Sequence, residues 1–159
     1  MCITVAGKEL TQVTVINQDL KVVYTTLVKP NRPIIDYNTR FSGITEKDLE
    51  DVNTPLKDVQ NKLLDLFCSK TVLIGHSLNC DLVALKIIHD VVVDTSVIYP
   101  DSRGLPYKRP LRQLVTRYLN RNIQNSAGGH DSGEDAKACF ELILRLFRKQ
   151  EEDLENSYY

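Results

Sequence analysis

A short apolar run, Thr71–Gly75, constrains the fold of this chain more than any other part of the sequence. It lacks the alternation typical of a strand with one solvated face, so it predicts a strand buried on both faces, as in a parallel sheet. A second run of this kind, Val91–Asp94, follows a helical pattern that Ser77 opens and His89 ends. Strand, helix and strand in this order predict an α/β protein with a mixed sheet and helices on its faces.

Two runs of alternating polarity come earlier in the chain. Leu10–Ile16 and Lys21–Val28 flank a turn at Asn17–Asp19, and together they predict an antiparallel hairpin. Asp36–Gly43 is expected to be an irregular loop, because no periodic pattern runs through it. Thr45, with a carboxylate three residues later, predicts a short helix opened by a capping box.

Three longer helices are expected. One begins at Thr54-Pro55 and ends at Phe67, one spans Leu111–Leu119, and one begins at Ser132. At 159 residues the chain predicts one domain, residues 1–147, followed by a charged and disordered tail at 148–159. The side chains of the last helix expected to face inward are Ala136, Cys139, Phe140, Ile143 and Phe147.

The composition excludes some classes of protein. No run of about 18 apolar residues occurs, so no membrane span is expected. The four cysteines show neither Cys-x-x-Cys spacing nor a framework pattern, which favours free thiols in a reducing compartment.

Positive charge is concentrated in one stretch of the chain. The net charge is only −1, yet residues 102–130 contain no acidic side chain. Such a local excess predicts a surface that binds phosphates, although a solvated helix face is the simpler alternative. The basic residues of this stretch are Arg103, Lys108, Arg109, Arg112, Arg117 and Arg121.

A histidine and an aspartate stand five residues apart at the start of the last helix. His130 suits a general base because its imidazole can be neutral near physiological pH. Asp135 and Asp81, each in the first turn of a helix, are candidate ligands of divalent ions, which two-metal phosphodiester hydrolysis places roughly 4 Å apart. Each also has a plain alternative: Asp81 can complement a helix dipole, Asp135 can complete a capping box, and His130 can be an ordinary loop residue. Asp94, which ends a strand, is expected to orient neighbouring groups.

The order of these motifs resembles the DEDDh 3′–5′ exonucleases, and within them the RNA exonuclease 1 type. The resemblance covers about Lys8 to Phe147. It is closest in Asp36–Thr45, Ile74–Leu78, Val93–Ser96 and Leu105–Arg109.

This resemblance implies an RNase H-like mixed sheet flanked by helices, and hydrolysis from an RNA 3′ end that releases nucleoside 5′-monophosphates with Mg²⁺ or Mn²⁺. It implies that Asp81 and Asp135 bind metal and that His130 deprotonates the attacking water. It also implies nuclear residence; the sequence identifies no protein partner. The residues expected to contact the nucleic acid are Asn38, Phe41, His76, Lys108, Arg109 and Arg112, although the position of His76 also suits packing or hydrogen bonding.

The sequence departs from the family at its first motif. The family carries Asp-x-Glu on its first, central strand, whereas this chain begins Met1-Cys2, which resembles the end of that motif. We expect the exonuclease domain to be N-terminally incomplete and without that strand, and therefore a poor binder of divalent ions and inactive as written. Two alternatives stay open: a catalytically inactive module that binds RNA or protein, and an exonuclease directed at DNA.

Overall fold

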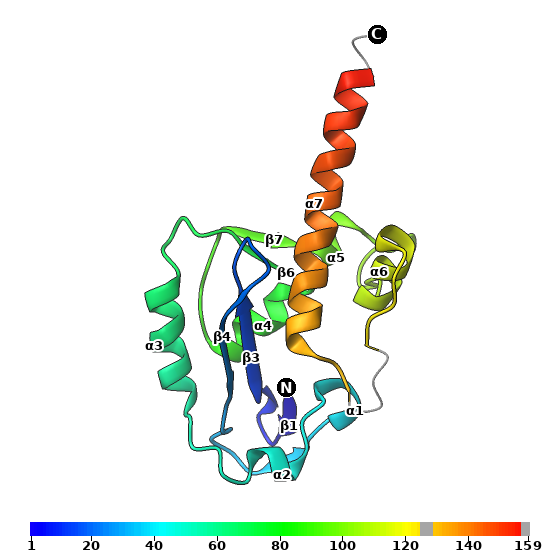
Figure 1. The fold of residues 1–159 in the computed structure, drawn as a ribbon. Coiled ribbons are helices and arrows are strands. Elements are labelled where there is room, and N and C mark those ends of the chain that lie inside the picture. The colour runs from blue at the N-terminus through cyan, green and yellow to red at the C-terminus, as the bar shows by residue number, and fades with distance from the viewer. Residues whose placement is uncertain (125–128, 157–159) are drawn as a thin grey trace.

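The computed structural model describes residues 1–124 and 129–156. Helix α7 crosses the body of the molecule, and its C-terminal half projects beyond the other elements (Figure 1). The elements are β1 Cys2–Thr4, β2 Gly7–Glu9, β3 Gln12–Ile16, β4 Val22–Leu27, β5 Ile34–Asp36, α1 Thr39–Ser42, α2 Glu46–Leu49, α3 Leu56–Leu66, β6 Leu73–Gly75, α4 Leu78–Leu85, β7 Val92–Asp94, α5 Thr95–Ile98, α6 Leu111–Leu119 and α7 Ser132–Asn156.

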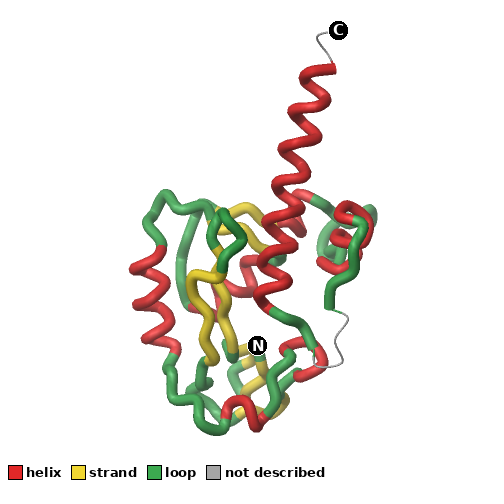
Figure 2. The backbone as a smooth tube through the Cα atoms, viewed as in Figure 1, coloured by secondary structure: helices red, strands yellow, loops and turns green. Residues whose placement is uncertain are grey.

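The predicted α/β class is confirmed, and its strands form three small sheets. β1 pairs antiparallel with β2 and β5, β3 pairs antiparallel with β4, and β6 pairs parallel with β7. The hairpin and the parallel pair are thus confirmed. Over residues 1–124 and 129–156 no strand joins β3 to β6, and both strands pack against α7 instead. In Figure 2 the strands are surrounded mainly by helices and loops.

The two apolar strands are more exposed than their sequences predicted. Val72 is 52% exposed and Val92 41% exposed, so the prediction of burial on both faces is wrong. The reason is that β6 and β7 form a sheet of only two strands, which leaves faces and edges without neighbouring elements to cover them.

Two apolar clusters hold these elements together. In the first, α6 packs against the buried Ala138, Cys139 and Leu142 of α7, with Ile74 of β6 at its margin. In the second, Val59 and Leu63 of α3 pack beneath the hairpin. The N-terminal half of α7 is therefore well packed, and this packing fixes the direction of its first turn.

Helix starts follow the predictions only in part. The capping box at Thr45 is confirmed, because its hydroxyl accepts the Asp48 N–H and the Asp48 carboxylate accepts the Thr45 N–H. α3 begins one residue later than predicted, with Pro55 rather than Thr54 as its cap. Ser77 precedes α4 but its side chain caps nothing, since its φ of 57° turns the backbone left-handed. α4 ends at Leu85 and not at His89, because Lys86 is also left-handed.

The loop and the tail also differ from expectation. The segment Asp36–Gly43 contains a single helical turn, α1, which Gly43 ends with a φ of 70°. Beyond Arg148 the chain stays helical to Asn156, where disorder was expected. Opposite charges four positions apart, as at Arg148 and Glu152, support an exposed helix of this kind. Phe147 is 57% exposed and does not face inward.

Candidate active site

The first turn of α7 brings His130 and Asp135 together. Nδ1 of His130 lies 3.8 Å from Oδ2 of Asp135. The backbone N–H of Asp135 donates to the Asp131 carbonyl at 3.0 Å, and the Asp131 carboxylate accepts the N–H groups of Gly133 and Glu134. Asp131, rather than Ser132, therefore satisfies the free N–H groups at this helix start.

Two glycines allow the approach of His130 to α1. Gly129 has a φ of +94° and packs against Gly43, so that a Cβ at Gly129 would lie 2.4 Å from the Gly43 backbone. The next residue, His130, donates its N–H to the Phe41 carbonyl at 3.4 Å. The rings of His130 and Phe41 meet edge to face with centroids 5.9 Å apart.

Asp135 is held by a residue that the sequence analysis missed. Gln124 donates its side-chain amide to Oδ1 of Asp135 at 2.8 Å, while its backbone N–H donates to the Glu134 carboxylate. Burial raises the pKa of Asp135, and the Gln124 hydrogen bond opposes that shift only in part. No short-range pattern signals this role, because Gln124 lies eight positions before the first residue of α7.

Asp81 stands in the first turn of α4, directly after β6. Burial raises the pKa of its carboxyl to about 6, although the nearby α-ammonium of Met1 opposes the shift. Ionisation of such a buried carboxyl group lowers the stability of the folded state. Carboxyl groups with a raised pKa are common at functional sites.

Asp94 fixes the junction between β6 and α4. Its carboxylate accepts the N–H groups of Ser77 at 2.8 Å, Leu78 at 3.0 Å and Ser96 at 2.8 Å. Burial would raise the pKa of Asp94, but the hydrogen bonds from Ser96, Ser77 and Leu78 outweigh it and lower the pKa. The expectation that Asp94 orients its neighbours is confirmed, and it replaces the cap that Ser77 does not provide.

Cys139 lies on the same helix as Asp135. It is buried one turn after Asp135 on α7. Burial raises the pKa of its thiol to about 12, and the negative charges of Asp135, Asp81 and Asp94 add to the shift.

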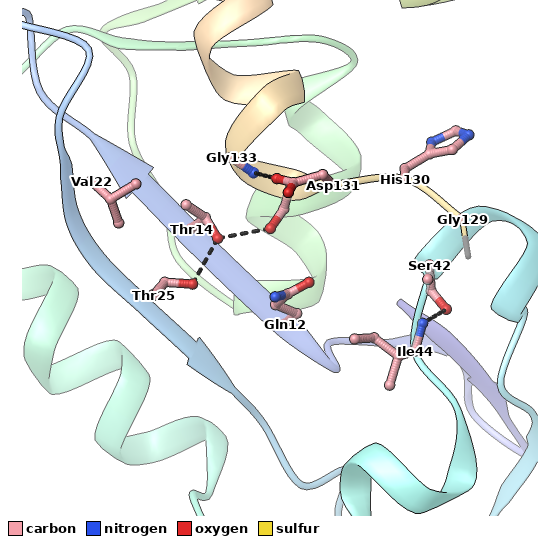
Figure 3. A pocket seen from close by; sticks show the side chains of 12 residues that line it. Gln12, Thr14, Val22, Thr25, Ser42, Ile44, Gly129, His130, Asp131 and Gly133 are labelled. Carbon is pink, nitrogen blue, oxygen red and sulfur yellow. Dashed lines mark hydrogen bonds between the residues drawn. The ribbon is translucent and has the colours of Figure 1, made fainter. Parts of the chain in front are cut away.

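A pocket of about 390 Å³ opens beside this helix turn (Figure 3). Its floor is the β3–β4 hairpin, where Thr14 lies 2.9 Å from the Thr25 hydroxyl and 2.7 Å from the Ser132 hydroxyl. Gly129, His130 and Asp131 line another side, and Ser42–Ile44 close it. The lining combines the hydroxyl groups of Thr14, Thr25, Ser42 and Ser132 with the apolar side chains of Val22 and Ile44.

The residues expected to contact nucleic acid fall in two places. Asn38 directly precedes α1, and the 53% exposed Phe41 lies within α1, next to His130. Lys108 lies near α4 and donates to Ser77 and Asn79, each at 3.2 Å. His76 is half-buried, and its Nδ1 lies 2.9 Å from the Thr95 hydroxyl, so its ring has a structural partner.

The basic stretch does not form one continuous cationic surface. Arg103 is paired with Asp101 at 2.9 Å, and Arg121 is paired with Glu141. Arg109 is partly buried, whereas Arg112 is exposed on α6. The charge available for phosphates is thus smaller than the sequence indicated.

The candidate ligands are of the chemical type that divalent ions prefer, but they are few. Carboxylate oxygens are what Mg²⁺ and Mn²⁺ prefer, and Asp81 and Asp135 supply them. In the part of the chain that the structure describes, no group of three or more histidine, cysteine or acidic side chains is arranged to hold a metal. None of the helices in that part is both long and apolar enough to cross a bilayer.

Comparison with known proteins agrees with this arrangement. The family described as Exonuclease matches residues 7–143. The chain is 56% identical over 149 residues to human RNA exonuclease 1 homolog, covering 94% of this chain and 12% of that protein. It spans 12–26% of the length of the curated relatives it matches.

Solved structures show the same fold. The Neurospora crassa Pan2 catalytic unit superposes with a TM-score of 0.79 at 23% identity, over 99% of this chain and 28% of that one. The Saccharomyces cerevisiae Pan2 module in complex with A7 RNA superposes with a TM-score of 0.71 at 28% identity, over 88% and 24%.

The fold is that of an RNase H-like exonuclease domain. The chain belongs to the Exonuclease family. Members of this family use divalent metal ions.

Proposed function

We propose that this chain is a 3′–5′ exonuclease domain directed at RNA. The observation that carries the proposal is the contact between His130 and Asp135 at the start of α7, where Nδ1 and Oδ2 lie 3.8 Å apart. The high identity to a protein named RNA exonuclease 1 homolog, and the likeness to a module solved with RNA, favour RNA over DNA as the substrate.

The roles follow from the side chains. His130 accepts the proton of the attacking water, and Asp135 beside it favours the imidazolium that forms. Asp81 and Asp135 present carboxylate oxygens to Mg²⁺ or Mn²⁺. A divalent ion held there supplies charge neutralisation at the scissile phosphate. Phe41, next to His130, is placed to contact the terminal nucleotide, and Lys108, Arg109 and Arg112 to contact phosphates.

The number of ligands limits this chain. Two carboxylates leave most of the coordination of two divalent ions to water, so we expect weak ion binding. The chain is then expected to bind an RNA 3′ end without trimming it at a measurable rate. The shortage of ligands in residues 1–124 and 129–156 also favours the second candidate, a module that binds RNA without hydrolysing it.

A paired binding and cleavage assay tests the proposal. Linear single-stranded RNA labelled at its 5′ end is compared with circular RNA of the same sequence, by anisotropy without metal and by gel with Mn²⁺. Linear RNA is expected to bind more tightly and to stay intact. Equal affinity would contradict recognition of the 3′ end.

Two variants show whether any cleavage in this assay depends on His130. Shortening of the RNA that disappears in His130→Ala, but persists in His89→Ala, would show an active site despite the missing ligands. Tighter binding of a DNA strand of the same sequence would favour the DNA-directed alternative. Nuclear residence stays a proposal, tested by imaging the tagged chain in cells.

A further inference from the structure

The loop between α5 and α6 exposes two large apolar side chains. Leu105 is 86% exposed and Tyr107 is 51% exposed. Lys108 and Arg109 follow these two residues directly in the sequence. Exposed apolar side chains beside basic ones are typical of contact surfaces rather than of a folding core. The proposed roles of His130, Asp81 and Asp135 do not use them.

Tyr107 is part of a pre-arranged stack. The guanidinium carbon of Arg103 lies 4.0 Å from the centroid of the Tyr107 ring. Asp101 holds that guanidinium through two hydrogen bonds, at 2.9 Å from Nε and 3.2 Å from an Nη. Because Asp101 already neutralises part of the charge of the Arg103 guanidinium, Arg103 is better suited to stacking than to binding a phosphate.

The backbone of the loop supports this arrangement. Gly104 donates its N–H to the Asp101 carbonyl and Tyr107 donates its N–H to the Gly104 carbonyl, each at 3.0 Å. These two turns fix the spacing between Arg103 and Tyr107. The stack therefore exists before any ligand binds, and little ordering is needed on binding.

Lys108 connects the stack to the candidate active site. The residue after Tyr107 reaches Ser77 and Asn79 at the start of α4, and Asn79 is two positions from Asp81. A strand of RNA with its 3′ end near Asp81 would pass this loop on leaving the site.

We propose that Arg103, Leu105 and Tyr107 form a platform on which an unpaired base of single-stranded RNA stacks. The inference rests on the proposed function, since it assumes that RNA is the ligand. An aromatic ring beside an arginine plane stacks on any base, so the platform selects single strands without selecting a sequence. A base within a duplex has no free face to offer.

The test measures stacking separately from charge. Single-stranded RNA with an internal 2-aminopurine is titrated with the whole chain in EDTA, at several salt concentrations. Tyr107→Ala is expected to weaken binding about fivefold or more and to remove the quenching of 2-aminopurine. The slope of affinity against salt should not change, because no phosphate contact is lost. Tyr107→Phe should behave as the unmodified chain.

Controls separate the possible failures. Phe147→Ala removes an aromatic side chain of similar exposure, 57%, from α7, and should change nothing. If the unmodified chain binds RNA and Tyr107→Ala binds it equally, the platform is wrong and the proposed function stands. If the unmodified chain does not bind RNA, both are wrong. An equal loss with duplex RNA would also overturn the platform, and would leave a protein partner as the occupant to test for.

Discussion

Gly129 and Gly43 pack backbone to backbone, so closely that a Cβ on Gly129 would lie 2.4 Å from both Cα and N of Gly43. The same Cβ would lie 2.6 Å from the Thr39 carbonyl oxygen. This contact joins the start of α7 to α1, and it places His130 beside Phe41. The position of the candidate base thus depends on the absence of two side chains.

Gly129→Ala is expected to be strongly destabilising. The φ of +94° alone disfavours alanine, by about 1–2 kcal/mol, and the backbone clash adds to that. We expect a total loss above about 3 kcal/mol in urea denaturation. Gly7→Ala is the matched control, because Gly7 has a φ of +99° with nothing within 4 Å of the added Cβ. Equal losses in the two variants would show that the contact with Gly43 can relax.

The sequence was sufficient for features that depend on local spacing. His130 precedes α7 by two residues and Asp135 lies in its first turn, so the sequence placed both residues at one helix start. The parallel pairing of β6 and β7 followed from their apolar runs and the helix between them. The role of Asp94 in orienting its neighbours followed from its position at the end of a strand.

Contacts between distant segments could not be predicted in this way. The Thr14 and Ser132 hydroxyls lie 2.7 Å apart across 118 positions, and no local pattern at either residue indicates the other. The division of the sheet was also beyond pattern analysis, because periodicity identifies strands but not the neighbour that each edge finds. Residues 148–156 are helical, whereas the expectation of disorder rested on composition without the helix-favouring charge spacing.

Asp94→Ala is expected to destabilise the fold through the junction of β6 and α4. The change leaves the backbone N–H groups of Ser77 and Leu78 without their acceptor. Each unsatisfied buried group costs about 1–3 kcal/mol, so we expect a loss of about 3 kcal/mol in thermal or urea denaturation. Asp90→Ala, at an exposed aspartate just before β7, should change stability by less than about 0.5 kcal/mol. A similar effect in both variants would contradict the role of Asp94.

Asp81→Asn is expected to stabilise the protein at neutral pH. Folding raises the pKa of this carboxyl from 3.8 to about 6, so between these pH values the folded chain binds more protons than the unfolded chain. The free energy of unfolding therefore falls as pH rises through this interval. Asparagine removes the ionisation, and we expect a gain of about 2 kcal/mol at pH 8.

The pH dependence provides the control for Asp81. Denaturation curves of the unmodified chain and of Asp81→Asn, measured from pH 4 to pH 8, should converge at the acidic end and separate at the basic end. Asp90→Asn should follow the unmodified chain throughout. Separation at the acidic end would mean that asparagine acts through packing and not through charge.

The affinity of the chain for Mn²⁺ is expected to be weak and to fall with acidification. The ion binds the ionised carboxylate, and below about pH 6 the Asp81 carboxyl is protonated, so binding must displace that proton. The dissociation constant should then rise about tenfold for each pH unit below 6. Because burial raises the pKa of Asp135 in the same direction, the dependence should steepen at lower pH. Calorimetric titration in two buffers of different ionisation enthalpy measures the released proton. Asp81→Asn should bind Mn²⁺ still more weakly and lose the first part of this pH dependence, whereas an affinity independent of pH between 5 and 7 would place the ion elsewhere.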